Sequence, residues 1–172
     1  MFVGFFLPHR AIPKQSFRAS RFGGYQPKRV TDFKKTVALH AKQAARDGGW
    51  DGSSGPLGLT LLFRFRCPKS AKKDERSRTR WHIKRPDLDN IEKAVTDGLA
   101  CLMVDDSQVC SKRSDKVIVK ENEEEGILVI LETLPPYEEM SHEYEPLADA
   151  DAQSDGPGGP DEQREEAGDD NL

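Results

Sequence analysis

The chain has 172 residues, with 26 lysine and arginine residues against 30 aspartate and glutamate residues and a formal net charge of −4. Its apolar runs fall far short of the roughly 20 residues needed to cross a bilayer, so the sequence argues against a membrane protein. The three cysteines form no CxxC pair, which argues against a disulfide scaffold or a zinc site with four cysteine ligands. A protein of the reducing cytoplasm is therefore expected.

The small net charge conceals two regions of opposite sign. Residues 1–131 carry 25 basic and 16 acidic residues, a balance of +9, whereas residues 132–172 carry one basic and 14 acidic residues, a balance of −13. A basic body is typical of proteins that bind polyanions. Because no basic amphipathic helix with a large aromatic face indicates a membrane surface, nucleic acid is the predicted partner.

The composition also predicts a domain boundary near residue 132. Residues 132–172 contain no valine, isoleucine, phenylalanine, tryptophan or cysteine, and they include the run Gly-Pro-Gly-Gly-Pro at 156–160. Such a segment cannot bury enough apolar surface to offset a backbone entropy cost of roughly 1–2 kcal/mol per residue. We expect one folded domain over residues 1–132 and a disordered acidic tail over 133–172.

Hydrophobic periodicity predicts six regular elements in the folded part. In chain order, these are a strand at 2–7, a helix at 28–46, a strand at 57–66, a helix at 87–102, and strands at 108–120 and 127–131. The segments at 8–26 and from 67 to Pro86 have the composition of loops. The order βαβαββ predicts an α/β fold of the α+β type, with a mixed β-sheet and two helices on one of its faces.

The loop before the second helix is strongly basic. Residues 64–85 include ten basic residues against two acidic ones, which contacts with a phosphate backbone explain better than an ordinary solvated surface. Trp81 in this loop either stacks on a base or packs at the rim of the domain. The residues predicted to contact DNA, two of them from the N-terminal loop, are Lys14, Arg18, Arg64, Arg66, Lys69, Lys72, Lys73, Arg76, Arg78, Arg80, Lys84 and Arg85.

Carboxylates gather around the second predicted helix. Asp87 follows Pro86 at the helix start, Asp89 lies in the first turn, and Asp106 returns from the far end at the entrance of a strand. Three oxygen ligands without cysteine or histidine describe a site for a hard cation, Mg²⁺ or Mn²⁺ in its place. The alternative is a capped helix with solvated acids, but carboxylates without a metal are out of place on a surface that binds phosphate.

Lys93 lies four residues beyond Asp89, on the same helix face. From there its ammonium group can reach a phosphate bound to the metal. The alternative is an ordinary helical ion pair with Asp89 or Asp97, and the spacing alone favours neither interpretation.

Two blocks of the sequence resemble the RusA family of Holliday junction resolvases. Residues 85–93, Arg-Pro-Asp-Leu-Asp-Asn-Ile-Glu-Lys, match the family's [KR]-P-D-x-D-N-x-x-K block. Residues 104–109, Val-Asp-Asp-Ser-Gln-Val, resemble its DD-[SA]-Q-V block. Residues 13–18 and 25–27 resemble the family's N-terminal basic segment more weakly, so the likeness spans roughly residues 1–132.

The resemblance implies that Asp87, Asp89 and Asp106 are catalytic, metal-binding carboxylates and that Lys93 is the catalytic lysine. The connection from the helix to the Asp-Asp pair is short for the family, which leaves Asp105 as an alternative third ligand. The implied protein is a homodimeric, Mg²⁺-dependent endonuclease of bacterial or phage origin. It would resolve four-way DNA junctions by paired symmetric nicks during DNA recombination and repair, which suits the two-fold symmetry of a dimer.

Two other functions stay open at this point. One is a non-catalytic accessory protein that binds branched DNA, and the other is a nuclease with a relaxed preference among branched structures. The presence of all four implied catalytic residues favours an enzyme. The acidic tail either competes with phosphate for the basic body or acts only as a solvated appendage.

Overall fold

The computed structural model describes residues 1–14, 18–20, 23–52 and 54–137; of residues 18–20 and 23–24 the backbone alone is described. Residue contacts divide the chain into Met1–Pro136 and Tyr137–Leu172. The helices and strands belong to the first unit, and the predicted acidic tail lies outside the described residues except for its first few positions.

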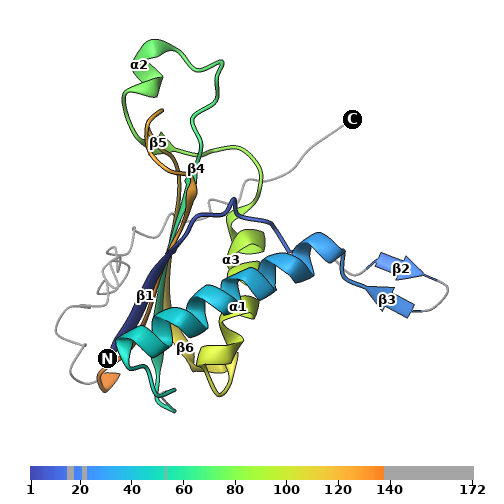
Figure 1. The fold of residues 1–172 in the computed structure, drawn as a ribbon, viewed down its shortest axis with the longest axis vertical. Coiled ribbons are helices and arrows are strands. Elements are labelled where there is room, and N and C mark those ends of the chain that lie inside the picture. Colours follow the sequence, from blue (N-terminus) through green and yellow to red (C-terminus); the bar gives the residue numbers. More distant parts are fainter. Residues whose placement is uncertain (15–17, 21–22, 53, 138–172) are drawn as a thin grey trace, which may run out of the picture. The chain divides into compact units, whose positions relative to one another are not determined.

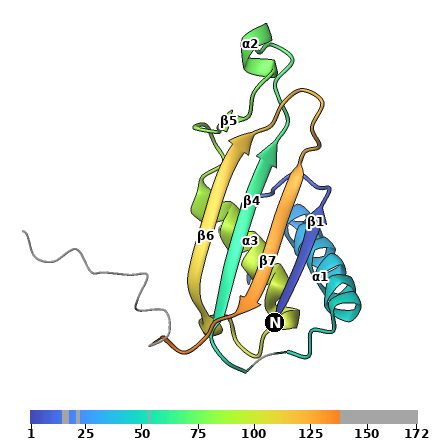
Figure 2. The ribbon, with the colours of Figure 1, turned by 90° about the vertical axis from the view of Figure 1, so that its left-hand side faces the viewer.

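A mixed sheet with two long helices on one of its faces forms the first unit (Figure 1). The elements are β1 Phe2–Leu7, β2 Arg18–Ser20, β3 Gly23–Tyr25, α1 Lys28–Gly48, β4 Leu57–Phe65, α2 Lys73–Arg76, β5 Arg80–Trp81, α3 Leu88–Leu99, η1 Ala100–Leu102, η2 Asp106–Gln108, β6 Val109–Ile118 and β7 Gly126–Thr133. The five strands follow the order β1-β7-β4-β6-β5 (Figure 2), and β2 pairs with β3 in a separate hairpin. Among the described strands of the large sheet, β4 and β6 run parallel and the other neighbours run antiparallel.

The two long helices cross closely over the sheet. The apolar positions of α1 recur at helical spacing and are buried, and the helix ends at Gly49, whose φ of 68° lies in the left-handed region that favours glycine. At the crossing, a Cβ on Gly98 of α3 would lie 2.7 Å from the Cβ of Val37 of α1. Glycine at position 98 therefore permits the contact that holds α3 in place. None of the described helices is long and apolar enough to cross a membrane.

The hydrophobic core lies between the sheet and these helices. On β4 the odd-numbered residues from Leu57 to Phe65 are buried, and the even-numbered residues from Thr60 onward are only partly buried, as expected for a strand with one covered face. Phe33 of α1 and Phe63 of β4 are both buried completely, and each stabilises the fold by roughly 1.5–3 kcal/mol. Because side chains alternate between the two faces of a strand, the buried face of the sheet also determines which residues of β6 point toward α3.

The predicted mixed sheet with two covering helices is confirmed, as are the six predicted elements, with shifts of a few residues at their ends. The prediction that 8–26 and 67–86 are entirely loop is wrong, because the structure adds the hairpin β2-β3, helix α2 and strand β5. These elements have two to four residues each, which is too short for hydrophobic periodicity to register. β5 exists through its pairing with β6.

Candidate active site

The first two turns of α3 present three exposed charged side chains. Asp87 is the N-cap residue, with φ −70° and ψ 143°, but its side chain makes no capping hydrogen bond. Asp87, Asp89 and Lys93 are all exposed, and none forms an ion pair with another described residue. Two carboxylates and an ammonium group are thus left available on one end of the helix.

A lysine of the sheet holds the segment that leads into α3. The Nζ of Lys116 on β6 donates hydrogen bonds to the carbonyl oxygens of Lys84, at 2.8 Å, and Pro86, at 2.7 Å. The backbone N–H of His82 donates to the Lys116 carbonyl at 3.0 Å. Lys116 therefore ties the residues directly before Asp87 to the sheet. Lys116 was not predicted from the sequence, because only the register of β6 turns it toward α3.

His82 is a packed residue of this segment. Its ring stacks on Phe65 with centroids 4.3 Å apart. Burial, together with the nearby Lys116 ammonium, lowers the pKa of His82 below its usual 6.5, so the ring is neutral at pH 7. His82 contributes packing beside the acidic motif and little positive charge.

The other acids of α3 are paired with lysines. Glu92 is almost fully buried, and its Oε2 lies 2.5 Å from the Nζ of Lys112 on β6. Asp97 Oδ2 lies 2.9 Å from Lys14 Nζ and 2.6 Å from Lys34 Nζ. Burial by itself raises the pKa of Asp97, but the hydrogen bonds from the two lysines outweigh it and hold the pKa below its usual 3.8.

These contacts show whether Lys93 forms the ordinary helical ion pair that its spacing allows. Its expected structural partner, Asp97, is bound by Lys14 and Lys34 instead. No ion pair to Asp89 is present among the described residues either. In the structure, the Lys93 ammonium group is therefore exposed and available at the start of α3.

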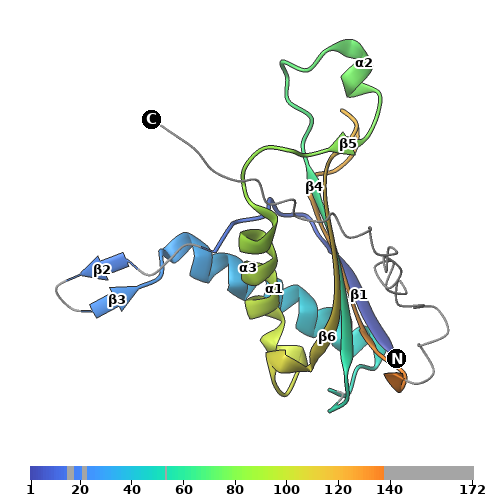
Figure 3. The same ribbon diagram turned by 180° about the vertical axis from the view of Figure 1, so that it is seen from behind.

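The connection from α3 to β6, which contains Asp105 and Asp106, lies beyond the opposite end of α3 (Figure 3). The 12 residues of α3 alone span about 18 Å, and the seven-residue rise along β6 from Val109 to Lys116 spans about 23 Å. Consistent with this separation, the described residues contain no group of three acidic, histidine or cysteine side chains that could hold a metal ion. The predicted third carboxylate does not join Asp87 and Asp89 within one chain.

The Asp-Asp pair is held by its own set of contacts. The Asp105 side chain caps η2 by accepting a hydrogen bond from the Ser107 N–H at 2.9 Å. Hydrogen bonds from Ser107 lower the pKa of Asp105, so this carboxylate is ionised in the neutral range. Gln108 Oε1 accepts from the backbone N–H groups of Val104 and Asp105 at 2.7 and 3.1 Å. Both carboxylates are exposed, but Asp105 is used as a cap, whereas Asp106 has no capping role.

A pocket of about 640 Å³ adjoins the start of α3. Its charged and polar lining comes from three separate segments of the chain, namely the N-terminal loop, the start of α1 and the acidic motif. The backbone N–H of Lys14 donates to the Asn90 carbonyl at 2.8 Å, which joins the first and third of these segments. The charged and amide side chains of the lining are Arg10, Lys14, Arg29, Arg85, Asp87 and Asn90.

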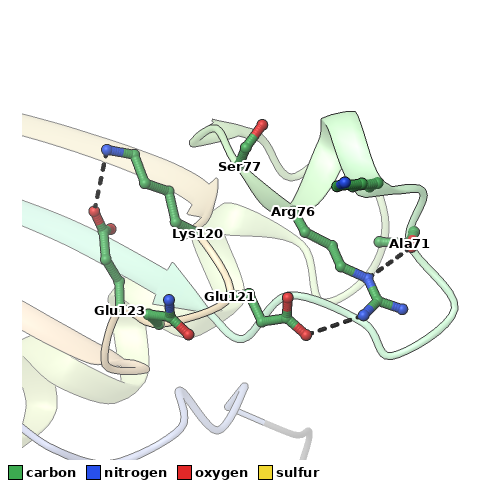
Figure 4. A pocket seen from close by; sticks show the side chains of 8 residues that line it. Ala71, Arg76, Ser77, Lys120, Glu121 and Glu123 are labelled. Atoms are coloured by element: carbon green, nitrogen blue, oxygen red, sulfur yellow. Dashed lines mark hydrogen bonds and ion pairs between the residues drawn. The ribbon is translucent and has the colours of Figure 1, made fainter.

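The predicted DNA-binding residues fall into two groups. Arg76 bonds to the carbonyl oxygens of Ala71 and Lys69 and to Glu121 of the β6-β7 turn, beside a pocket of about 670 Å³ (Figure 4). Arg64 pairs with Glu123 at 3.1 Å, and Arg80 pairs with Glu75 at 3.7 Å. These three arginines, like Lys14, are used within the fold.

The second group of predicted DNA-binding residues forms no ion pairs within the described part of the chain. These side chains are exposed; they are Arg66, Lys69, Lys72, Lys73, Arg78, Lys84 and Arg85. The side chain of Arg18 lies outside the described residues. Trp81, at the edge of the sheet, is 67% exposed and so does not pack into the rim.

Comparison with known proteins assigns the chain to a family. The family model described as endodeoxyribonuclease RusA matches residues 8–131, which is well over half of the chain and includes both ends of α3. No curated protein matches the chain. The chain therefore belongs to the RusA family of endodeoxyribonucleases.

Proposed function

We propose that this protein is a homodimeric, Mg²⁺-dependent Holliday junction resolvase that makes paired symmetric nicks. Its family consists of endodeoxyribonucleases that act on DNA junctions, and the protein is an enzyme of this class. The observation that carries the finer proposal is the group of exposed, unpaired charges of Asp87, Asp89 and Lys93 beside a basic pocket. We place its action in the cytoplasm of a bacterial cell, where junction DNA arises.

The carboxylates fit a hard divalent cation. Asp87 and Asp89 offer oxygen donors that no described cation neutralises, on a domain whose other exposed charges are mostly basic. A bound Mg²⁺ would supply Lewis-acid charge to the entering and leaving oxygens of the phosphodiester. Asp87 and Asp89 would hold it from one chain, and Asp106 would come from a second copy, because it is too distant within its own chain.

Lys93 is suited to a role in the transition state. It is one turn along α3 from Asp89, so its ammonium group faces the same region as that carboxylate. When water attacks the phosphorus in line with the leaving oxygen, negative charge builds on the non-bridging oxygens. Lys93 would stabilise that charge without being a metal ligand.

A two-fold dimer matches the substrate. It presents two identical sites related by an axis, and a four-way junction offers two strands related by the same symmetry. A dimer in which Asp106 crosses to the partner also assembles a complete site only when two copies meet. Cleavage by an isolated chain is thereby prevented.

Mixing two inactive variants tests this arrangement. Asp89→Asn and Asp106→Asn should each abolish nicking of a labelled four-way junction with Mg²⁺ present. When the two variants are unfolded together and refolded as mixed dimers, one of the two sites should hold all three carboxylates, and single nicks should return. A mixture of Asp87→Asn with Asp89→Asn is the matched control, because it leaves no complete site under either arrangement.

The outcomes separate the alternatives. If the first mixture is as inactive as the control, Asp106 does not act across a dimer. If Asp106→Asn alone keeps full activity, Asp106 is not a ligand. If the unaltered protein binds junctions and never cuts them with Mg²⁺ or Mn²⁺, the protein is a binding protein and the proposed catalytic function is wrong.

A further inference from the structure

The pocket beside Asp87 contains more positive charge than the fold uses. Four of its lining side chains are cationic, namely Arg10, Lys14, Arg29 and Arg85, and one is anionic, Asp87. In a protein, several cations that line one concave surface repel each other, unless an anion occupies the space between them. The excess of positive charge indicates that the pocket binds an anion.

Two of the four cations already have partners. Lys14 is bound to Asp97 at 2.9 Å, and Arg10 lies 3.8 Å from Glu125 with 64% of its side chain exposed. Arg29 and Arg85 are exposed and form no ion pair with any described residue. The pocket thus offers two guanidinium groups, and the guanidinium fork binds phosphate oxygens in a bidentate manner.

The walls of the pocket are fixed relative to one another. Asp97 of α3 binds Lys14 of the N-terminal loop and Lys34 of α1 at the same carboxylate oxygen. The N–H of Lys14 is bonded to the carbonyl of Asn90. Loop, α1 and α3 are therefore joined by charged contacts next to the pocket, so little ordering remains to be done when a ligand binds.

We infer that this pocket binds a backbone phosphate of the cleaved DNA strand, next to the phosphate at Asp87 and Asp89, through the guanidinium groups of Arg29 and Arg85. Asp87 lines the same pocket, so a strand that crosses the start of α3 places a neighbouring phosphate between the two arginines. Arg29 contacts DNA in addition to the basic residues predicted from the sequence. That this phosphate belongs to the cleaved strand rests on the proposed function, whereas the binding of a DNA phosphate by the pocket does not.

Replacing single phosphates of the junction by uncharged methylphosphonates tests the assignment without cleavage. Single methylphosphonates are placed at successive positions around the branch point of a four-way junction, and affinity is measured in EDTA. At one position per strand, the substitution should weaken binding by the unaltered protein roughly ten-fold, the loss of about one charged hydrogen-bonded contact. Arg29→Gln should bind the unmodified junction roughly ten-fold more weakly. At that position alone, its response to methylphosphonate should be smaller than that of the unaltered protein, because only Arg85 still contacts the phosphate.

Arg46→Gln is the matched control. Arg46 is an exposed arginine near the other end of the same helix, so its substitution changes net charge and helix composition equally. This variant should keep the full response to methylphosphonate at every position. If Arg29→Gln responds to each methylphosphonate as Arg46→Gln does, Arg29 contributes only general electrostatic attraction and the inference is wrong.

The test also distinguishes the two proposals. The position at which Arg29→Gln alters the response to methylphosphonate is the position coupled to Arg29. With Mg²⁺ added, it should adjoin the nick made by the unaltered protein. Coupling without any nick would leave the phosphate pocket in place and contradict the catalytic proposal. Nicking without coupling would support the catalytic proposal and contradict the assignment of the phosphate pocket.

Discussion

Helix α3 and its N-cap carry two sets of acidic residues, one bound by lysines and the other unpaired. Glu92 and Asp97 face the sheet and α1, and each is bound by lysines at 2.5 to 2.9 Å. Asp87 and Asp89 lie at the exposed start of the same helix and have no partner among the described cations. All four side chains are carboxylates, and the two sets are only a few residues apart.

The difference shows how the fold separates paired charge from unpaired charge. A carboxylate that accepts hydrogen bonds from two lysines is satisfied, so it stabilises the native state and has nothing left for a ligand. A carboxylate left unpaired, such as Asp87 beside Arg85, would be available to the divalent cation of the proposed function. Substitutions of paired and of unpaired residues should therefore have different effects.

The largest effect is expected from the unpaired acids. Asp87→Asn and Asp89→Asn should each reduce the rate of junction nicking about 100- to 1,000-fold, since electrostatic stabilisation of the transition state is lost. Junction affinity in EDTA should stay equal or become tighter, because a negative charge facing phosphate is removed. Single-turnover nicking and gel-shift titrations measure both. Wild-type cleavage by both variants would contradict the metal-site assignment.

The next effect is expected from Lys93. Lys93→Ala should lower the single-turnover rate about 100-fold while leaving the Mg²⁺ concentration for half-maximal rate unchanged, because the proposed role of the ammonium group is to stabilise transition-state charge and not to bind the metal. Lys93→Arg should recover part of the rate. Full rescue of the alanine variant by added Mg²⁺ would instead mean that Lys93 only positions the carboxylates.

The two groups of basic residues should differ in their effect on salt dependence. Removing the charges of Lys69, Lys72, Lys73 and Arg78 together should flatten the slope of log K against log[salt] by up to about 3–4, if all four contact phosphates. Arg76→Gln should change the slope by less than about 1 and should lower thermal stability, since Arg76 bonds within the fold. An unchanged slope for the quadruple variant would place this loop away from DNA.

The smallest effect is expected from the paired acid. Asp97→Asn should lower the free energy of unfolding at pH 7 by about 2 kcal/mol, the size of a charged hydrogen-bonded contact. The pKa of Asp97 is depressed in the folded state, so its contribution is present above the unfolded pKa near 3.8 and is lost as pH falls through the folded value. Urea denaturation at pH 7 and pH 3 should show the difference shrinking at the lower pH. Asp89→Asn, measured alongside, should show no loss of stability at pH 7.

Much of the fold follows from local sequence patterns. The helical spacing of Val30, Phe33 and Val37 and the apolar character of 57–65 predict α1 and β4, because periodicity reports which face is buried. The blocks at 85–93 and 104–109 identify the family without any structure. These features are local, so residues close together in the chain are enough to reveal them.

The sequence by itself therefore determined the order of the six longer elements, the basic body and the residues at the start of α3. Only the tertiary structure decided how the charges are divided. It paired Asp97 with Lys14 and Lys34 in place of Lys93, turned Lys116 toward Pro86, and brought Arg29 to the pocket beside Asp87. It also separated Asp106 from Asp87 by the length of α3. The physical reason is that a charge is satisfied by whatever lies within a few ångströms in space, and sequence spacing does not encode contacts between distant segments.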